Sequence, residues 1–160
     1  MSLGLSSYSD GSGGAIQAQG IDILRVAQAG TVGEAFFLGG VSETVQGSFA
    51  TTIGGSVTIP VDTGTVFLRA TNASITSWNF TNVGTNNGRS TSISVFISSN
   101  VSYTYGDTCT VNGTAVSGGI KWSGGSAPAP SANTDILTFV LIKDSSGTVH
   151  VFGFGTLNLS

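Results

Sequence analysis

The sequence predicts an all-β fold, an antiparallel β-sandwich or jelly-roll-like barrel that carries an N-terminal arm. From about residue 41 onward, apolar residues alternate with polar ones, which is the period of a half-buried sheet. Turn sequences rich in Asn, Asp and Gly separate these runs at short intervals. Beyond residue 41 no segment shows helical periodicity over a helix length. We therefore expect an arm over residues 1–40 and a β-sandwich domain over residues 41–160.

The arm is predicted to be flexible and to carry apolar patches. Residues 1–14 are rich in Ser and Gly, which is typical of flexible tails. Residues 15–29 fit a helix face and a strand face equally well. A short apolar patch bracketed by glycines follows, made of Ala35, Phe36, Phe37 and Leu38. We expect this patch to need a partner surface and to anchor the chain.

The strands of the β domain are predicted from alternation and from β-branched residues. The alternating sets are Val57, Ile59 and Val61; Val66, Leu68 and Ala70; and Ile93, Val95 and Ile97. Residues 138–142 are almost continuously apolar, so we expect a central strand covered on both faces. Residues 149–154 form a second such strand, joined to the first by a tight hairpin over residues 144–147. Further turns are expected at 62–64, 86–88 and 112–113.

The low charge of the chain excludes several classes of function. Charged residues make up 8% of the sequence, against roughly 25% in an average soluble domain. The five Lys and Arg residues are scattered singly, so no basic stripe is available for nucleic acid. No stretch approaches the roughly 20 apolar residues of a membrane helix. The single cysteine, Cys109, rules out an intrachain disulfide.

The residue types needed for catalysis or metal binding are sparse. His150 is the only histidine, and it lies inside an apolar strand, so we expect it to point outward from a sheet. Cys109 is expected to be a small buried or edge residue. The acids are not paired along the sequence, and a calcium site at Asp62 or Asp107 has no supporting motif. We therefore predict no catalytic residue, no cofactor and no metal.

The aromatic residues have two interpretations, core or contact surface. Trp78 has the same strand parity as Phe80, and Trp122 the same as an isoleucine, which favours the core for both tryptophans. Tyr103 and Tyr105 also share parity and form the best candidates for a small exposed aromatic platform. The alternative for them is an ordinary aromatic pair on a sheet surface.

The last quarter of the chain resembles a known protein family. Lys121 and Trp122 are followed by a Gly-Gly pair, by Ala127 and Pro128, by Asp135 before an apolar strand, and by a Gly/Phe-rich final strand. This order resembles the closing segment of a small all-β module found in structural proteins of marine bacteriophages, especially cyanophages. The resemblance is loose from Val41 to that segment and does not extend to the first forty residues.

The resemblance implies a non-enzymatic virion structural protein. The length of the chain and its arm favour a capsid-surface accessory, a decoration or knob-like protein, over a long tail fibre. The alternatives are a tail adaptor or tail-fibre component that recognises the host, and a carbohydrate-binding β module. The implied partners are the major capsid protein or other virion subunits, and a homo-oligomer is compatible with the sequence. Since no secretory signal is visible, we expect synthesis in the host cytoplasm and a final location in the virion. Within the virion, the capsid surface is favoured over the tail.

Overall fold

A computed structural model describes residues 6–9, 13–18, 21–27, 35–37 and 44–159, and side chains from residue 44 onward. The chain divides into two compact units, Met1–Ser42 and Glu43–Ser160. The first unit contains an antiparallel sheet in the order β1-β2-β3-β4. Its strands are β1 (Ser6–Ser9), β2 (Gly13–Ala18), β3 (Ile21–Ala27) and β4 (Ala35–Phe37). The segment that fitted a helix and a strand equally well therefore contributes strands.

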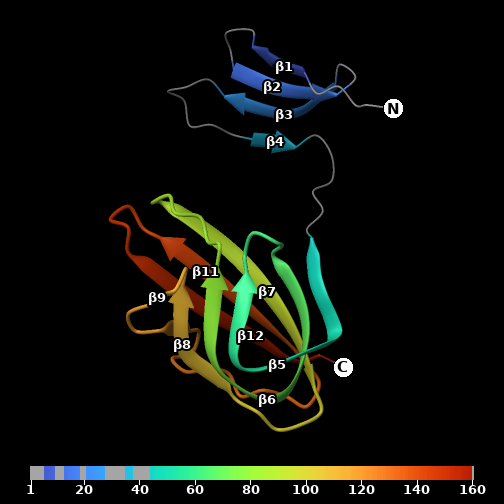
Figure 1. Cartoon of the computed structure of the whole chain (residues 1–160), viewed down its shortest axis with the longest axis vertical. Helices are drawn as coiled ribbons and strands as arrows, with labels where there is room; N and C mark the ends of the chain where they lie inside the picture. The colour runs from blue at the N-terminus through green and yellow to red at the C-terminus, as the bar shows by residue number, and fades with distance from the viewer. Residues whose placement is uncertain (1–5, 10–12, 19–20, 28–34, 38–43, 160) are drawn as a thin grey trace. The chain divides into compact units, whose positions relative to one another are not determined.

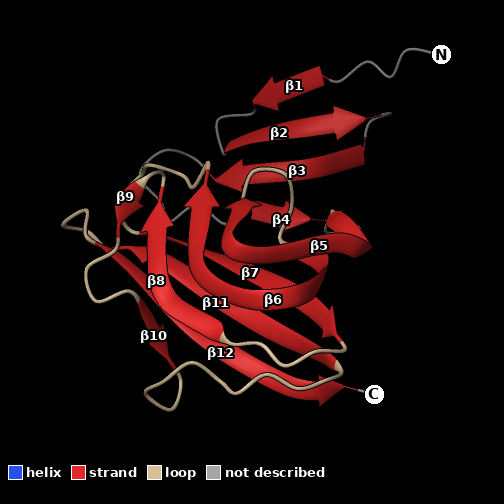
Figure 2. Cartoon of the chain, turned by 60° about the horizontal axis from the view of Figure 1, so that its bottom comes forward, coloured by secondary structure: helices blue, strands red, loops and turns tan. Residues whose placement is uncertain are grey.

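The second unit is built on one eight-stranded sheet. Its strands are β5 (Val45–Pro60), β6 (Val66–Thr81), β7 (Arg89–Ser99), β8 (Tyr105–Val111), β9 (Thr114–Ala115), β10 (Ile120–Trp122), β11 (Thr134–Lys143) and β12 (Val149–Leu159). Their order is β10-β12-β11-β7-β6-β8-β9, and β5 pairs with the other edge of β6. The described residues contain strands and loops only, and the sheet curls into a half-barrel (Figures 1 and 2). The all-β prediction is confirmed.

The long strands β5 and β6 bend back on themselves. They are parallel, with Val45 opposite Val66 and Pro60 opposite Thr81. A straight strand of 16 residues would span about 50 Å, whereas the connection 61–65 can reach only about 20 Å. Each strand must therefore form a U, and Figure 2 shows both ribbons curving in this way. The U-shaped strands β5 and β6 are thus two stacked turns of one coil. The third turn is made by β7 and β8, which run parallel to the first and second halves of β6.

Buried hydroxyl groups hold the corners of this coil. Thr71 and Ser99 are paired in register where β6 and β7 reach the bend. Thr71 Oγ1 donates to the carbonyl of Ile53 at 2.8 Å, and Ser99 Oγ donates to the carbonyl of Thr71 at 3.0 Å. These bonds satisfy carbonyls that leave the strand ladder, so the three turns stay stacked through the corner.

The pairing directions differ from the purely antiparallel arrangement that we expected. The pairs β7–β11, β11–β12 and β8–β9 are antiparallel, while β6 runs parallel to its three neighbours and β10 runs parallel to β12. Parallel neighbours arise here because the chain winds in one sense through successive turns, and no sequence repeat marks those turns. Strands β5 to β8 are therefore wound like a solenoid in their geometry.

Aromatic side chains fill the inside of the half-barrel. The Phe139 ring centroid lies 4.8 Å from that of Trp78, 5.2 Å from that of Phe80 and 5.7 Å from that of Trp122. Trp78, Phe80 and Phe139 are fully buried, and Trp122 is nearly so. The assignment of both tryptophans to the core is confirmed. The indole N–H of Trp122 donates to Asp107 at 2.9 Å, which joins β10 to β8 across the open side of the sheet.

The predicted turns are present. Asn112 and Gly113 connect β8 to β9 with φ of 49° and 80°, which is the left-handed pair that a tight hairpin requires. The hairpin between β11 and β12 places Lys143 opposite Val149, with Asp144 N–H donating to the carbonyl of Thr148. β11 itself is buried on one face and only half-buried on the other, so the prediction of cover on both faces is wrong within the second unit.

Candidate functional site

The predicted attachment patch is only partly described. Ala35, Phe36 and Phe37 form β4, which pairs with β3, but their side chains lie outside the described part of the structure. Leu38 lies outside the described residues altogether. An anchoring role for this patch therefore remains a prediction.

The prediction that Tyr103 and Tyr105 form an exposed pair is wrong. Tyr103 is 6% exposed and Tyr105 is 5% exposed, and their rings meet edge to face at 5.1 Å. The physical reason is Asp135, whose fully buried carboxylate lies 2.9 Å from the Tyr105 hydroxyl and 3.2 Å from the Tyr103 hydroxyl. Both phenols therefore face inward to a buried charge and present no aromatic platform.

Asp135 joins three separate parts of the chain. Besides the two tyrosines before and at the start of β8, it accepts hydrogen bonds from the backbone N–H and the hydroxyl of Ser131 and from the backbone N–H of Asn158 on β12. Burial alone would raise the pKa of the Asp135 carboxyl, but the hydrogen bonds from Ser131, Asn158 and Tyr105 hold the pKa below its ordinary value. The carboxylate is thus ionised, and the cluster is a structural lock.

The tyrosine hydroxyls are shifted in the opposite direction. Burial, with the neighbouring carboxylate, raises the pKa of Tyr103 to about 12 and raises the pKa of Tyr105 further above its ordinary range. Both phenols remain neutral donors at physiological pH, which is the state that the buried carboxylate requires.

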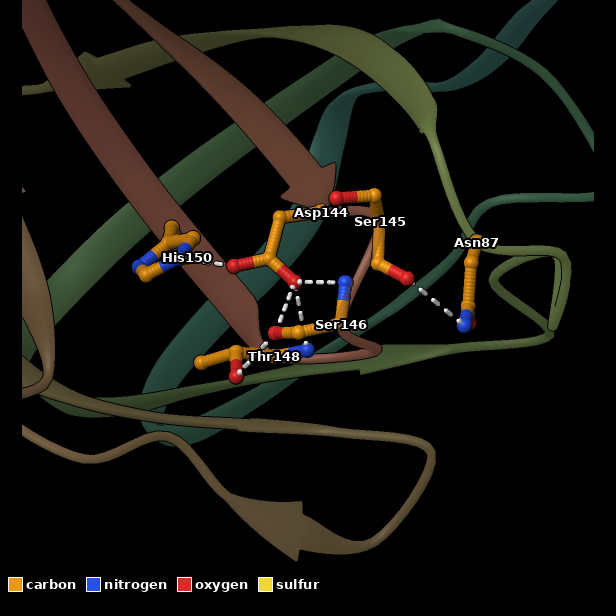
Figure 3. Close-up of polar contacts among 6 residues, drawn as sticks. All are labelled: Asn87, Asp144, Ser145, Ser146, Thr148 and His150. Atoms are coloured by element: carbon orange, nitrogen blue, oxygen red, sulfur yellow. Dashed lines mark hydrogen bonds and ion pairs between the residues drawn. The ribbon is translucent and has the colours of Figure 1, made fainter.

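His150 lies on the outward face of β12, as predicted, and belongs to a hydrogen-bonded turn (Figure 3). One carboxylate oxygen of Asp144 accepts from the Ser146 hydroxyl and from the N–H groups of Ser146 and Thr148. The other lies 3.1 Å from His150 Nε2. The Ser146 hydroxyl and then His150 are the main groups that hold the pKa of Asp144 below its ordinary range.

The order of groups in this turn does not activate a nucleophile. In a hydrolytic triad the imidazole stands between the hydroxyl and the carboxylate and takes the hydroxyl proton. Here the carboxylate of Asp144 stands between Ser146 and His150, and the hydroxyl donates to the acid (Figure 3). The arrangement fixes the β11–β12 hairpin, with Asn87 donating to the Ser145 carbonyl at 3.4 Å.

Several residues in the last quarter of the chain pack closely against one another. Gly153 lies so close to the Trp122 ring that a Cβ there would collide with it. A Cβ at Gly155 would lie 2.9 Å from Pro128. Together with Asp135, these contacts fold the loop between β10 and β11 over the last strand. These residues therefore hold the loop against β12.

An apolar surface on the outer face of the sheet was not predicted from the sequence. By register, eight apolar side chains from four neighbouring strands point to this face. They are Val66 and Leu68 on β6, Phe96 on β7, Ile136, Val140 and Ile142 on β11, and Phe152 and Phe154 on β12. Phe154 is 44% exposed and the others are half-buried. We call these eight residues the outer face; the continuous apolar runs of β11 and β12 are the signal that could have revealed it.

The outer face carries no formal charge over these strands. The other side chains that point in the same direction from β7, β11, β12 and the part of β6 paired with β7 are Ala, Ser and Thr, with His150 at one end. Lys121, on the edge strand β10, borders the face with its ammonium 5.6 Å above the Phe152 ring. Within the second unit, no strand or loop buries this surface.

Other kinds of site have no support among the described residues. No group of three or more His, Cys, Asp or Glu side chains comes together there as a metal site would require. The part of the chain that the structure describes also contains no helix long and apolar enough to cross a membrane. Comparison with protein-family models, with curated proteins and with solved structures finds no match for this chain.

Proposed function

We propose that this chain is a non-enzymatic structural protein of a phage particle, bound to the capsid surface as a decoration or knob-like accessory. The outer face is the observation that carries the proposal. A contiguous apolar surface of this kind is typical of a protein–protein contact, because leaving it in water is unfavourable. An assembly subunit covers such a face permanently.

The absence of charge on the outer face indicates what kind of surface the partner presents. A charged surface would lose its hydration against this face without gaining an ion pair, so the partner must present apolar side chains of its own. Another protein subunit of a particle fits this requirement. Burial of the exposed 44% of Phe154 contributes roughly 1 kcal/mol before ordering costs.

The phage assignment draws on the resemblance of the segment from Lys121 to the final strand. The arm adds a second means of attachment in this proposal, through Phe36 and Phe37. Many copies on a lattice would then each use two contacts, and the binding energies of linked contacts reinforce one another.

Co-sedimentation with purified particles tests this proposal. We expect the full chain to pellet with particles, and Phe152→Ser combined with Phe154→Ser to reduce the bound fraction strongly. Phe49→Ser is the control, because Phe49 is 45% exposed but lies on β5 and is not one of the eight outer-face residues. Deletion of residues 1–40 should also abolish attachment while the β domain stays folded. Unchanged binding of the Phe152/Phe154 variant would contradict the role of the outer face.

A tail adaptor is the second candidate, since a small tail subunit would use an apolar face in the same way. A carbohydrate-binding module is supported by a cavity of 580 Å³ between residues 100–105 and 127–132. The buried tyrosines give that cavity no stacking platform, which makes sugar recognition the weaker of the two alternatives.

A further inference from the structure

A second cavity opens at the end of the coil where the connections between turns lie. It has a volume of 300 Å³, at the lower limit for small-molecule sites. The loop after β6, the ends of β7 and β11 and the β8–β9 hairpin surround it. Its apolar lining comes from Val83, Val111, Leu141 and Val149. Mouths of β-barrels are a common position for ligands.

Two cations face each other at this cavity. Arg89 at the start of β7 is the direct cross-strand partner of Lys143 at the end of β11, and both line the cavity. Both continue the inward-pointing rows of their strands, beyond Thr91 and Leu141. Like charges directly opposite each other in a sheet are destabilising. An anion bound between Arg89 and Lys143 would relieve this repulsion.

The described part of the protein does not supply that anion. Lys143 Nζ donates to the carbonyl of Thr85 at 2.7 Å, and among residues 44–159 neither cation forms an ion pair. Asp144 is adjacent to Lys143 in the sequence, but both of its carboxylate oxygens are taken up by Ser146, Thr148 and His150 (Figure 3). No acidic residue lines the cavity.

We propose that this cavity binds a small organic carboxylate with a compact apolar body. The carboxylate lies between the guanidinium of Arg89 and the ammonium of Lys143, where two charged donors converge on one anion. The apolar body lies against Val111, Leu141 and Val149. This site shares only Ile142 with the outer face and does not depend on that face, so its failure would leave the proposed assembly role untouched.

A titration of the isotope-labelled full chain, followed by amide NMR shifts, tests the proposal with benzoate as the probe. We expect saturable shifts at Arg89, Thr91 and Lys143 and in the loop containing Val83. Benzyl alcohol, which keeps the ring and lacks the charge, should give much weaker shifts. Inorganic phosphate, which keeps the charge and lacks the ring, should also bind more weakly than benzoate. Equal binding of either comparison compound would overturn the assignment of the ligand class.

Variants of the two cations supply an independent measurement. Arg89→Gln and Lys143→Gln should each weaken benzoate binding by about tenfold, while Lys121→Gln, the matched control at the outer face, leaves it unchanged. Because Arg89→Gln also removes the like-charge contact, it should raise the melting temperature of the ligand-free protein at low salt. Retained benzoate binding in both variants, or a lowered melting temperature for Arg89→Gln, would overturn the proposal.

Discussion

The Tyr105 hydroxyl donates to the Asp135 carboxylate at 2.9 Å, and both side chains are buried. The bond links the start of β8 to the start of β11, two strands that are not neighbours in the sheet. Ser131 and Asn158 complete the shell around the same carboxylate. The cluster therefore holds the starts of β8 and β11 together. Because it contains a carboxylate and two phenols, the free energy of unfolding should depend on pH in both acid and alkali.

Asp135→Asn should lower the free energy of unfolding by about 3 kcal/mol or more at pH 7, because an amide NH₂ would face donors that now bind a charged acceptor. The native pKa of Asp135 lies below the ordinary value of 3.8, so its stabilising contribution is complete above that value and is lost as pH falls through the native pKa. Urea unfolding from pH 7 to pH 2 measures both effects. Asp62→Asn, on an exposed turn, is the control, and equal stability of the two variants would contradict the lock.

Tyr103→Phe should reduce the loss of stability in alkali. The native pKa of Tyr103 is about 12 and the unfolded value about 10, so the unfolded chain releases the phenolic proton first. Stability from this group is therefore present below pH 10 and declines as pH rises from 10 to 12. Denaturant unfolding at pH 8 and pH 11 should show a smaller drop for the variant than for the wild type. An identical drop would mean that Tyr103 is not in the buried cluster.

Phe139→Ala should lower the free energy of unfolding by about 3–5 kcal/mol, because it removes the ring that contacts Trp78, Phe80 and Trp122. Phe154→Ala, on the adjacent strand but 44% exposed, should cost less than about 1 kcal/mol. Chemical denaturation of the two variants makes the comparison. A cost near zero for Phe139→Ala would show that β11 does not lie at the centre of the core.

Cys109 should be protected from thiol reagents in the native protein. It is 4% exposed, and burial raises its pKa to about 11, so little reactive thiolate forms at pH 8. Labelling with iodoacetamide should proceed at least about a hundredfold faster in urea than in buffer, since reaction requires opening of the sheet. Equal rates would place the thiol at the surface.

Local sequence patterns predicted the strands and turns well, because these depend on neighbours along the chain. The alternation of Val57, Ile59 and Val61 marked the second half of β5, which ends just before Val61, and Asn112 with Gly113 marked a turn that demands positive φ. The shared parity of Trp78 and Phe80 placed both in the core. Each inference needed only the period of the strand or the φ preference of a residue.

Features that depend on distant pairing could not be predicted in this way. Parallel stacking of β5, β6 and the β7–β8 turn follows from the bends, and no residue spacing in the sequence encodes their positions. Burial of Tyr103 depends on Asp135, which lies in β11, far along the chain. The Arg89–Lys143 pair likewise exists only through the register of β7 and β11.

The central claim is that the chain belongs to a phage particle, and immunogold electron microscopy tests it most directly. An antibody raised against residues 41–160 would be applied to particles purified from the host that produces the chain. We predict gold label distributed over the particle head. Label confined to the tail would select the tail-adaptor alternative, and particles that carry no label would contradict the account.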